Sequence, residues 1–272
     1  MSRLAANFRA GLVYGLLSLA AFLSIFPFFW MLVGTTNTAA DIIKGKISFG
    51  GALFQNISNL FAQVDMLQVF WNSALLAVVG TILTLAVSSL AGYAFEMFQS
   101  KTRERLFSVL LLILSIPFAA IMVPLFVMMA KLKLINTFTA ILLPIIASVF
   151  IIFYFRQATK AFPRELRDAA KIDGLKEWQI FVYIYLPVMR STYAAAIIIV
   201  FLANWNNYLW PLIVLQTNEN KTLTLVISSL ASSYYPDYGV VMVATVLATL
   251  PTVIVFFLLQ RRFVEGLTGS IK

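Results

Sequence analysis

Charged and polar side chains are concentrated in one segment of the chain, from Lys160 to Pro187, while most of the remaining sequence is strongly apolar. From Glu165 this segment reads E-L-R-D-A-A-K-I-D-G-L-K-E-W-Q-I-F-V-Y-I-Y-L-P. The chain contains no His and no Cys, so a zinc site, a haem site or a Cys/His nucleophile has almost nothing to be built from. The chemistry that suits the segment is therefore docking, through charge pairing and hydrogen bonding, rather than catalysis.

Two short helices are expected to position these side chains. Pro163 suits a first helical position, Glu165 lies near the positive end of the helix dipole, and Lys171 lies in the last turn before Gly174. The pattern predicts a helix from about Pro163, a tight turn at Gly174, a second helix and a stop at Pro187. Together these elements form a helix-turn-helix hairpin.

The first helix of the hairpin has two interpretations. Its face is small and slightly apolar, which would let the surface of a partner protein approach the backbone closely. That face is made of Leu166, Ala169, Ala170, Asp173 and Gly174. Alternatively, the helix pair rests on lipid headgroups, with Trp178, Phe181 and Tyr185 as interfacial anchors.

The composition is that of an integral membrane protein, because 61% of the residues are apolar, 11% are charged and the mean hydropathy is +0.91. The apolar runs show no two-residue alternation, so we predict an all-α polytopic membrane protein with six transmembrane helices in one domain, residues 1–272. Pro117 and Pro124 should bend or break the third helix. The predicted spans are Leu12–Val33, Phe70–Phe95, Leu106–Met129, Phe138–Phe155, Tyr193–Leu215 and Gly239–Leu259.

The Lys and Arg residues predict the orientation. With the N-terminus inside, fifteen of the 20 basic residues fall in inside segments, so both termini are expected in the cytoplasm. The hairpin (about 160–187) and a tail (about 261–272) then also lie there. Topology and anionic lipid account for the net charge of +9, which disfavours a nucleic-acid partner. The first apolar run exceeds a signal-peptide core and is expected to be a retained helix.

The sequence disfavours two energy sources for this chain, namely coupling to an ion gradient and ATP binding of its own. All eleven Asp and Glu residues lie in loops or at span ends, whereas ion-coupled carriers usually place acidic groups at mid-membrane. The sequence also has no G-x-x-x-x-G-K-[ST] phosphate loop. If the protein performs transport work, another subunit is expected to supply the energy.

The hairpin resembles the cytoplasmic signature of the permease subunits of bacterial ABC importers, and the likeness extends over nearly the whole chain. The family signature is Glu-Ala-Ala, three residues, Gly, nine residues, Ile, one residue and Leu-Pro. Here the positions are Asp168-Ala169-Ala170, Gly174, Ile184 and Leu186-Pro187. Asp168 departs from the usual Glu and is one methylene shorter. Further similarity to the sugar-type branch, which includes the second permease of maltose-like systems, lies at Asn72-Ser73, Leu134 to Thr137, Trp205 to Tyr208 and Gln260 to Gly269.

This resemblance implies a heterodimer with a second permease, two cytoplasmic ATPase subunits that carry ATP and Mg²⁺, and an extracytoplasmic solute-binding protein. The chain itself would bind no cofactor, would not be an enzyme and would lie in the bacterial inner membrane. The implied ATPase-coupling residues are Asp168, Ala169, Ala170, Asp173, Gly174, Ile184 and Pro187. The tail residues Gly266, Gly269 and Lys272 are a second candidate contact with the ATPases, although the positive-inside rule explains a basic tail equally well.

The transported substrate is expected to be an oligosaccharide or a related sugar, moved by alternating access. A sugar needs hydrogen-bonding groups and aromatic faces at mid-membrane, and the best candidates lie in the fifth span. They are Asn204, Trp205, Asn206, Asn207 and Tyr208. The same residues could instead tie helices together, because Asn forms hydrogen bonds across helix interfaces in lipid. A polyol phosphate such as glycerol phosphate is the alternative substrate, and a non-transporting membrane scaffold is the alternative function.

Overall fold

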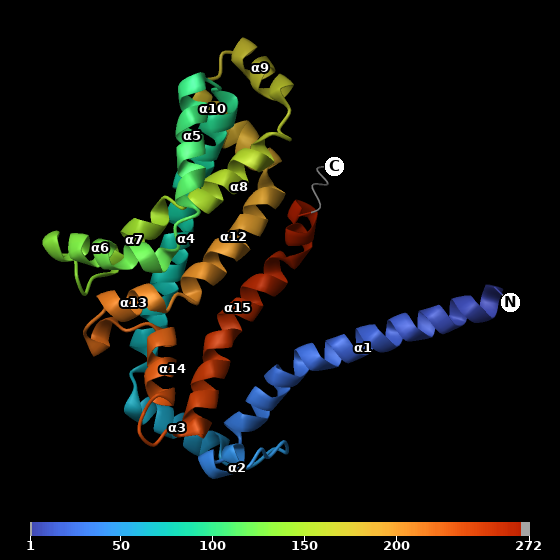
Figure 1. Ribbon diagram of the computed structural model, residues 1–272, viewed down its shortest axis with the longest axis vertical. Helices are drawn as coiled ribbons and strands as arrows, with labels where there is room; N and C mark the ends of the chain where they lie inside the picture. The colour runs from blue at the N-terminus through green and yellow to red at the C-terminus, as the bar shows by residue number, and fades with distance from the viewer. Residues whose placement is uncertain (1, 268–272) are drawn as a thin grey trace. The chain divides into compact units, whose positions relative to one another are not determined.

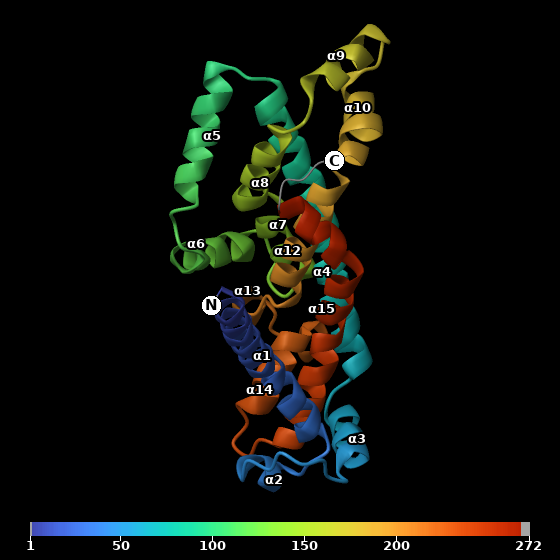
Figure 2. The same cartoon turned by 90° about the vertical axis from the view of Figure 1, so that its right-hand side faces the viewer.

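The computed structural model describes residues 2–267, and every regular element in that part of the chain is a helix (Figures 1 and 2). In chain order these are α1 (Ser2–Thr35), α2 (Ala39–Ile43), α3 (Leu53–Gln63), α4 (Met66–Met97), α5 (Lys101–Ile113), α6 (Phe118–Lys131), α7 (Phe138–Ile146), α8 (Val149–Thr159), α9 (Arg164–Ile172), α10 (Glu177–Ile180), the π-helix η1 (Phe181–Tyr185), α11 (Leu186–Val188), α12 (Arg190–Trp205), α13 (Leu209–Val214), the 3₁₀ turn η2 (Asn218–Asn220), α14 (Leu223–Ala231) and α15 (Tyr238–Leu267).

Within the described residues, five segments are long and apolar enough to cross a membrane, and a sixth candidate is bent. The five are Ala10–Thr35, Met66–Met97, Phe138–Thr159, Arg190–Val214 and Tyr238–Arg261. They correspond to five of the predicted spans, and the all-helical membrane fold is confirmed.

The third predicted span is divided into α5 and α6, which are bent by 100° relative to each other. Pro117 is the N-cap of α6, with φ −65°, so the fixed proline φ and the missing N–H lie at the break. Pro124 lies inside α6 and does not end it. In both views α6 lies across the direction of α5 (Figures 1 and 2). The prediction of a bend was therefore right, and Pro117 marks its position.

The chain divides into two compact units, and the expectation of one domain stays a prediction. The smaller unit contains Met1–Met66 and Ile227–Leu250. Within it, the buried Asn56 amide donates to the carbonyls of Thr35 and Asn37, both at 2.9 Å. These bonds satisfy carbonyls near the end of α1 that have no helical partner.

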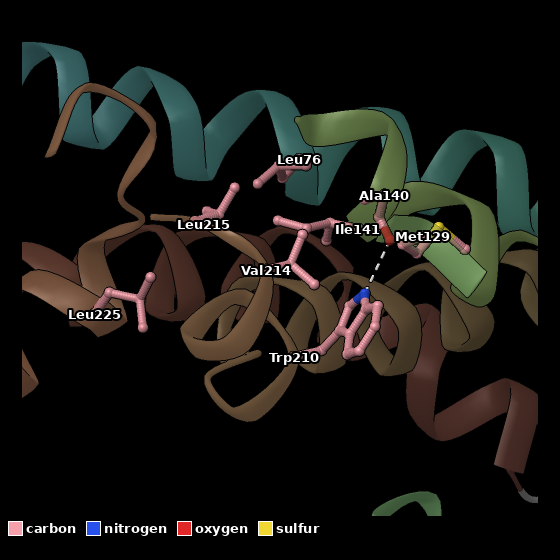
Figure 3. Close-up of a cluster of buried hydrophobic side chains, with 8 residues drawn as sticks. All are labelled: Leu76, Met129, Ala140, Ile141, Trp210, Val214, Leu215 and Leu225. Atoms are coloured by element: carbon pink, nitrogen blue, oxygen red, sulfur yellow. Dashed lines mark hydrogen bonds between the residues drawn. The ribbon is translucent and has the colours of Figure 1, made fainter. Parts of the chain in front are cut away.

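The larger unit contains Leu67–Val226 and the chain from Pro251 onward. One of its cores is formed by Leu76, Met129, Ala140, Ile141, Trp210, Val214, Leu215 and Leu225 (Figure 3). In that core the Trp210 indole Nε1 donates to the Ala140 carbonyl at 2.9 Å. Pro144, four residues after Ala140, has no N–H to offer that carbonyl, so the indole replaces the missing helical hydrogen bond.

Two spans of the larger unit are interrupted by short non-helical breaks. The span Phe138–Thr159 breaks between α7 and α8 at Ala147 and Ser148. The span Arg190–Val214 breaks between α12 and α13, from Asn206 to Tyr208. Non-helical backbone at membrane depth is tolerated only inside protein or beside a cavity, so these breaks indicate where a site can lie.

The connection after α13 is fixed by the two short segments that resemble the sugar-type branch. Asn136, at φ 63°, accepts hydrogen bonds from the backbone N–H groups of Gln216 and Thr217 at 3.0 and 3.2 Å. The Asn72 amide donates to the Glu219 carbonyl at 2.7 Å. Ser73 accepts from the Leu223 N–H at 2.7 Å. In this chain both segments therefore hold a loop in place.

Candidate functional site

The first helix of the hairpin, α9, ends in a Schellman turn built around Gly174. Gly174 has φ +84°, a conformation that costs a residue with a Cβ about 1–2 kcal/mol. The Leu175 N–H donates to the Ala170 carbonyl at 2.9 Å and the Gly174 N–H to the Lys171 carbonyl at 3.0 Å. The break predicted at Gly174 is confirmed. It is caused by the positive φ of Gly174 and by the two backbone hydrogen bonds that close the turn.

The predicted coupling residues on α9 do not all face the same way. Asp168, Ala169, Asp173 and Gly174 are exposed, whereas Ala170 is buried with 4% exposure. Ile172, next to them, is 88% exposed, which is unusual for an isoleucine in the last turn of a helix. The exposed surface of α9 thus combines the acidic Asp168, the small Ala169 and two large apolar side chains, Leu166 and Ile172, while Ala170 packs inward.

The second helix of the hairpin does not stop at Pro187, contrary to the prediction. It runs from α10 through the π-helix η1 into α11, which ends at Val188. In the π turn the Leu186 N–H reaches back five residues to the Phe181 carbonyl. The Met189 N–H returns to the usual spacing by donating to the Tyr185 carbonyl. The widened turn directly before Pro187 lets the chain continue as a helix past a residue with no N–H.

The last two predicted coupling residues, Ile184 and Pro187, lie on this second helix. Ile184 is half-buried and packs against a cluster of Tyr93, Phe162, Phe181, Tyr185 and Met189, whereas Pro187 is exposed. Neither residue shares the outward face of α9.

The two helices of the hairpin are joined by the carboxylate of Glu177. Arg167 on α9 approaches it at 2.5 Å through Nη2 and 3.3 Å through Nε, and Lys171 approaches it at 2.8 Å. The Tyr93 hydroxyl on α4 donates to the same carboxylate at 3.1 Å. Sequence analysis did not find this cluster, because nothing in the spacing of these residues indicates that the Gly174 turn folds them together.

Burial and charge pairing act in opposite directions on the Glu177 cluster. Burial alone would raise the pKa of Glu177, but hydrogen bonds from Arg167, Lys171 and Tyr93 outweigh it and lower that pKa. Burial likewise opposes the charge of Arg167, whose pKa is nevertheless raised by Glu177. Glu177 and Arg167 therefore both carry their charges at neutral pH.

A second ionic cluster lies beside the hairpin, at the ends of α4 and α8. Arg156 is 3.6 Å from Glu96 and 2.6 Å from Glu104, and its guanidinium lies 3.9 Å from the centre of the Phe107 ring. Glu96 also pairs with Arg164 at 3.2 Å. Arg156 and Glu96 are 6% and 5% exposed, so these two charges compensate each other in a largely dry environment.

A cavity of about 400 Å³ lies in the larger unit, where the helix breaks meet. Its polar lining comes from Thr84 on α4, Ser148 between α7 and α8, and Asn204 and Asn207 at the end of α12. Phe118 and Trp210 belong to its apolar lining. The volume falls within the range of small-molecule sites, about 300–1,000 Å³.

Of the five residues predicted on the substrate path, Asn204 and Asn207 line this cavity. The Asn204 Nδ2 is buried and has no hydrogen-bond partner in the part of the chain that the structure describes, so it is a donor available to a ligand. Trp205 instead packs its ring 5.6 Å from that of Phe70, and the Asn206 amide caps the Leu202 carbonyl at 2.9 Å. Tyr208 packs against the core of Figure 3. The polar stretch therefore divides into two cavity-lining amides and three residues that are not in the lining.

Two cavity residues, Thr84 and Ser148, were missed by the sequence analysis. Thr84 donates to the Ile145 carbonyl at 3.1 Å, next to the break that Pro144 and Ser148 make in the fourth span. A proline and a serine near the middle of an apolar run were the available signal.

The three residues of the predicted tail contact are only partly described by the structure. Gly266 lies in α15, while Gly269 and Lys272 lie outside the described residues.

Comparisons with known proteins agree with this architecture. Residues 86–269 match the family described as binding-protein-dependent transport system inner membrane component. The chain is 70% identical over 259 residues to the lactose transport system permease protein LacG of Rhizobium radiobacter, covering 95% of both chains. It is 36% identical over 258 residues to the arabinooligosaccharides transport system permease protein AraQ of Halalkalibacterium halodurans, covering 93% of this chain and 92% of that protein.

Among solved structures, the fold is similar to a chain of a bacterial ABC transporter involved in the import of the acidic polysaccharide alginate. The TM-score is 0.82 at 19% identity, over 95% of this chain and 98% of the other. At this identity the likeness concerns the fold. The family match covers residues 86–269, and the relatives at 70% and 36% identity match 95% and 93% of this chain. These comparisons lead to the same conclusion. The chain belongs to the family of binding-protein-dependent transport system inner membrane components, the permeases of ABC importers.

Proposed function

We propose that this permease moves an uncharged oligosaccharide, with lactose as the first candidate, across the bacterial inner membrane by alternating access. The observation that carries the substrate class is the cavity at the helix breaks. It offers amide and hydroxyl groups beside aromatic and aliphatic surface, which is the mixture that a sugar ring requires. The relative at 70% identity is named a lactose permease, and this name supports the choice of sugar.

A polyol phosphate is the second candidate substrate, and the cavity disfavours it. A phosphate carries about two negative charges at neutral pH and is usually bound by Arg, Lys or a helix N-terminus. None of the described residues that line the cavity is Lys or Arg. A site of this composition binds neutral hydroxyl groups without leaving a buried charge unpaired.

The energy for transport comes, in this proposal, from two partner ATPases that carry ATP and Mg²⁺. The exposed face of α9 docks with one of them, and a second permease subunit and an extracytoplasmic binding protein complete the importer. This arrangement requires the hairpin and both termini to be cytoplasmic, as the distribution of Lys and Arg predicts. This chain itself binds no cofactor in the proposal.

Uptake measurements test the substrate proposal. Cells that lack the gene are complemented with the wild-type chain, and the uptake of radiolabelled lactose is measured with unlabelled lactose, maltose or glycerol 3-phosphate as competitor. We expect uptake that depends on the chain, that unlabelled lactose inhibits and that glycerol 3-phosphate leaves unchanged. Uptake of glycerol phosphate but not of lactose would overturn the substrate assignment.

A further inference from the structure

Three helices meet at the Glu177 carboxylate. Glu177 belongs to α10, Arg167 and Lys171 come from α9, and Tyr93 comes from α4. Arg167 is also held from its other side, because its guanidinium lies 4.9 Å from the centre of the Phe98 ring. Glu177 lies outside the positions on which the resemblance to the permease signature rests, so that signature assigns it no role.

The attachment leaves the outer surface of α9 available. The side chain of Arg167 is 14% exposed, whereas Asp168, Ala169 and Ile172 face outward. One side of α9 is thus tied to the protein through Glu177, and the other is open to a partner. In both views α9 lies at one end of the larger unit, away from α6, α7 and α13 (Figures 1 and 2).

Tyr93 connects this attachment with the cavity. Its ring packs 4.8 Å from that of Tyr185 and 5.3 Å from that of Phe181, so the second helix of the hairpin is packed on α4. The helix α4 is continuous over 32 residues and contributes Thr84 to the cavity lining. Tyr93 lies nine positions after Thr84 in the helix, a distance of about 14 Å along the axis.

We propose that Glu177 is a positioning residue that joins α9 to α4, so that a displacement of α9 by its partner reaches the cavity as a movement of α4. The inference rests on the proposed function, because the ATPase supplies the displacement. A continuous helix transmits such a movement because its hydrogen-bonded backbone resists compression and bending, whereas a loop would absorb it.

The test compares the wild type with Glu177→Gln, Glu177→Asp and Tyr93→Phe in the complete importer, reconstituted in proteoliposomes with its binding protein. The measured quantity is the number of ATP molecules hydrolysed per lactose imported, together with the KM for ATP. We expect Glu177→Gln to raise the ratio roughly fivefold, which corresponds to about 1 kcal/mol of lost coupling. Glu177→Asp should restore part of the coupling, and Tyr93→Phe should raise the ratio less. The control is Lys176→Gln, which removes an exposed charge beside Glu177 and should leave the ratio unchanged.

A distance measurement separates positioning from general stability. The chain contains no Cys, so spin labels attached at Ile172→Cys on α9 and Val109→Cys on α5 report only on those two exposed positions of the purified chain. We expect one narrow distance distribution in the wild type and a broad one when Glu177→Gln is added, with both proteins measured well below their thermal unfolding transitions.

Each outcome is decisive for the inference. An unchanged ATP-to-lactose ratio in Glu177→Gln would overturn it, as would a parallel loss of uptake, hydrolysis and thermal stability, which indicates a structural role only. If the wild-type importer neither takes up lactose nor hydrolyses ATP in response to its binding protein, the proposed function itself fails. A working wild type with an unchanged ratio in the variant refutes only the role of Glu177.

Discussion

At the residue scale, Gly174 illustrates how one position can serve the fold and the function together. Its positive φ closes the Schellman turn, and a Cβ built on it would meet no atom of the described residues within 4 Å. A substitution by a bulky residue therefore strains the backbone whether or not a partner docks there. A loss of transport in such a variant cannot by itself be attributed to docking, so exposed Ala169 is the better position for testing the surface.

The charge of Glu177 predicts a dependence of stability on pH. Its folded-state pKa lies below the unperturbed value of 4.5, so the cluster stabilises the protein fully above about pH 4.5. The contribution is lost as the pH falls through the lowered pKa. We expect Glu177→Gln to unfold at a lower temperature than the wild type at pH 7, and this difference to shrink as the pH falls below about 4.5. A difference that stays constant as the pH falls would contradict the charge assignment.

Arg156 is expected to be the most sensitive position in the second ionic cluster. Replacement by Met removes the buried cation that pairs with Glu96 and leaves the exposed Arg164, and breaking a buried pair typically costs about 3–5 kcal/mol. Arg164→Gln is the matched control, because its side chain is 58% exposed and a surface pair contributes about 0–1 kcal/mol. Thermal unfolding in detergent should show a large decrease for Arg156→Met and a small one for the control. Equal decreases in unfolding temperature would mean that burial does not determine how much stability is lost when the ion pair is broken.

At the element scale, the close approach of α4 and α12 depends on Gly80. A Cβ at this position would lie 2.9 Å from the Asn204 Nδ2 and 3.1 Å from the Ile145 Cδ1. We expect Gly80→Ala to displace the Asn204 amide and raise the KM for lactose uptake roughly fivefold, equivalent to about 1 kcal/mol. Gly15→Ala is the control, because no atom of the residues that the structure describes lies within 4 Å of the added Cβ. An unchanged KM in Gly80→Ala would argue against Asn204 as a substrate contact.

The elements also show which parts of the structure were predictable from the sequence. Five spans and the turn at Gly174 follow from apolar length and from a residue that tolerates positive φ. The continuation of the helix through Pro187 did not follow, because it depends on a π turn.

Tertiary contacts explain most of what the sequence did not reveal. The Ala140 carbonyl accepts a hydrogen bond from Trp210, and Glu177 pairs with Arg167 and Lys171 of the preceding helix α9. Both interactions join residues of different helices, and these residues come into contact only when the chain folds. The division of residues 204–208 into cavity-lining and other residues likewise depends on which side of a broken helix each one faces.

At the scale of the whole molecule, the distribution of charge predicts the topology. Tyr234 and Ile172 are 89% and 88% exposed, and the chain has no Cys of its own. We expect a membrane-impermeant maleimide to label Tyr234→Cys in intact spheroplasts and to label Ile172→Cys only after the membrane is permeabilised. The opposite pattern would invert the orientation and place the hairpin outside the cell, where no ATPase could reach it.

The most direct test of the account is whether the outward face of α9 couples ATP hydrolysis to transport. Ala169→Trp adds bulk to that face without strain at Gly174, and Ala161→Trp makes the same change at an exposed position before α9. In the reconstituted importer we predict that Ala169→Trp loses lactose uptake and binding-protein-stimulated ATP hydrolysis by tenfold or more, equivalent to about 1.4 kcal/mol. Ala161→Trp should retain both, and both variants should insert normally. Full stimulation and uptake with Ala169→Trp would contradict the assignment of α9 as the docking helix.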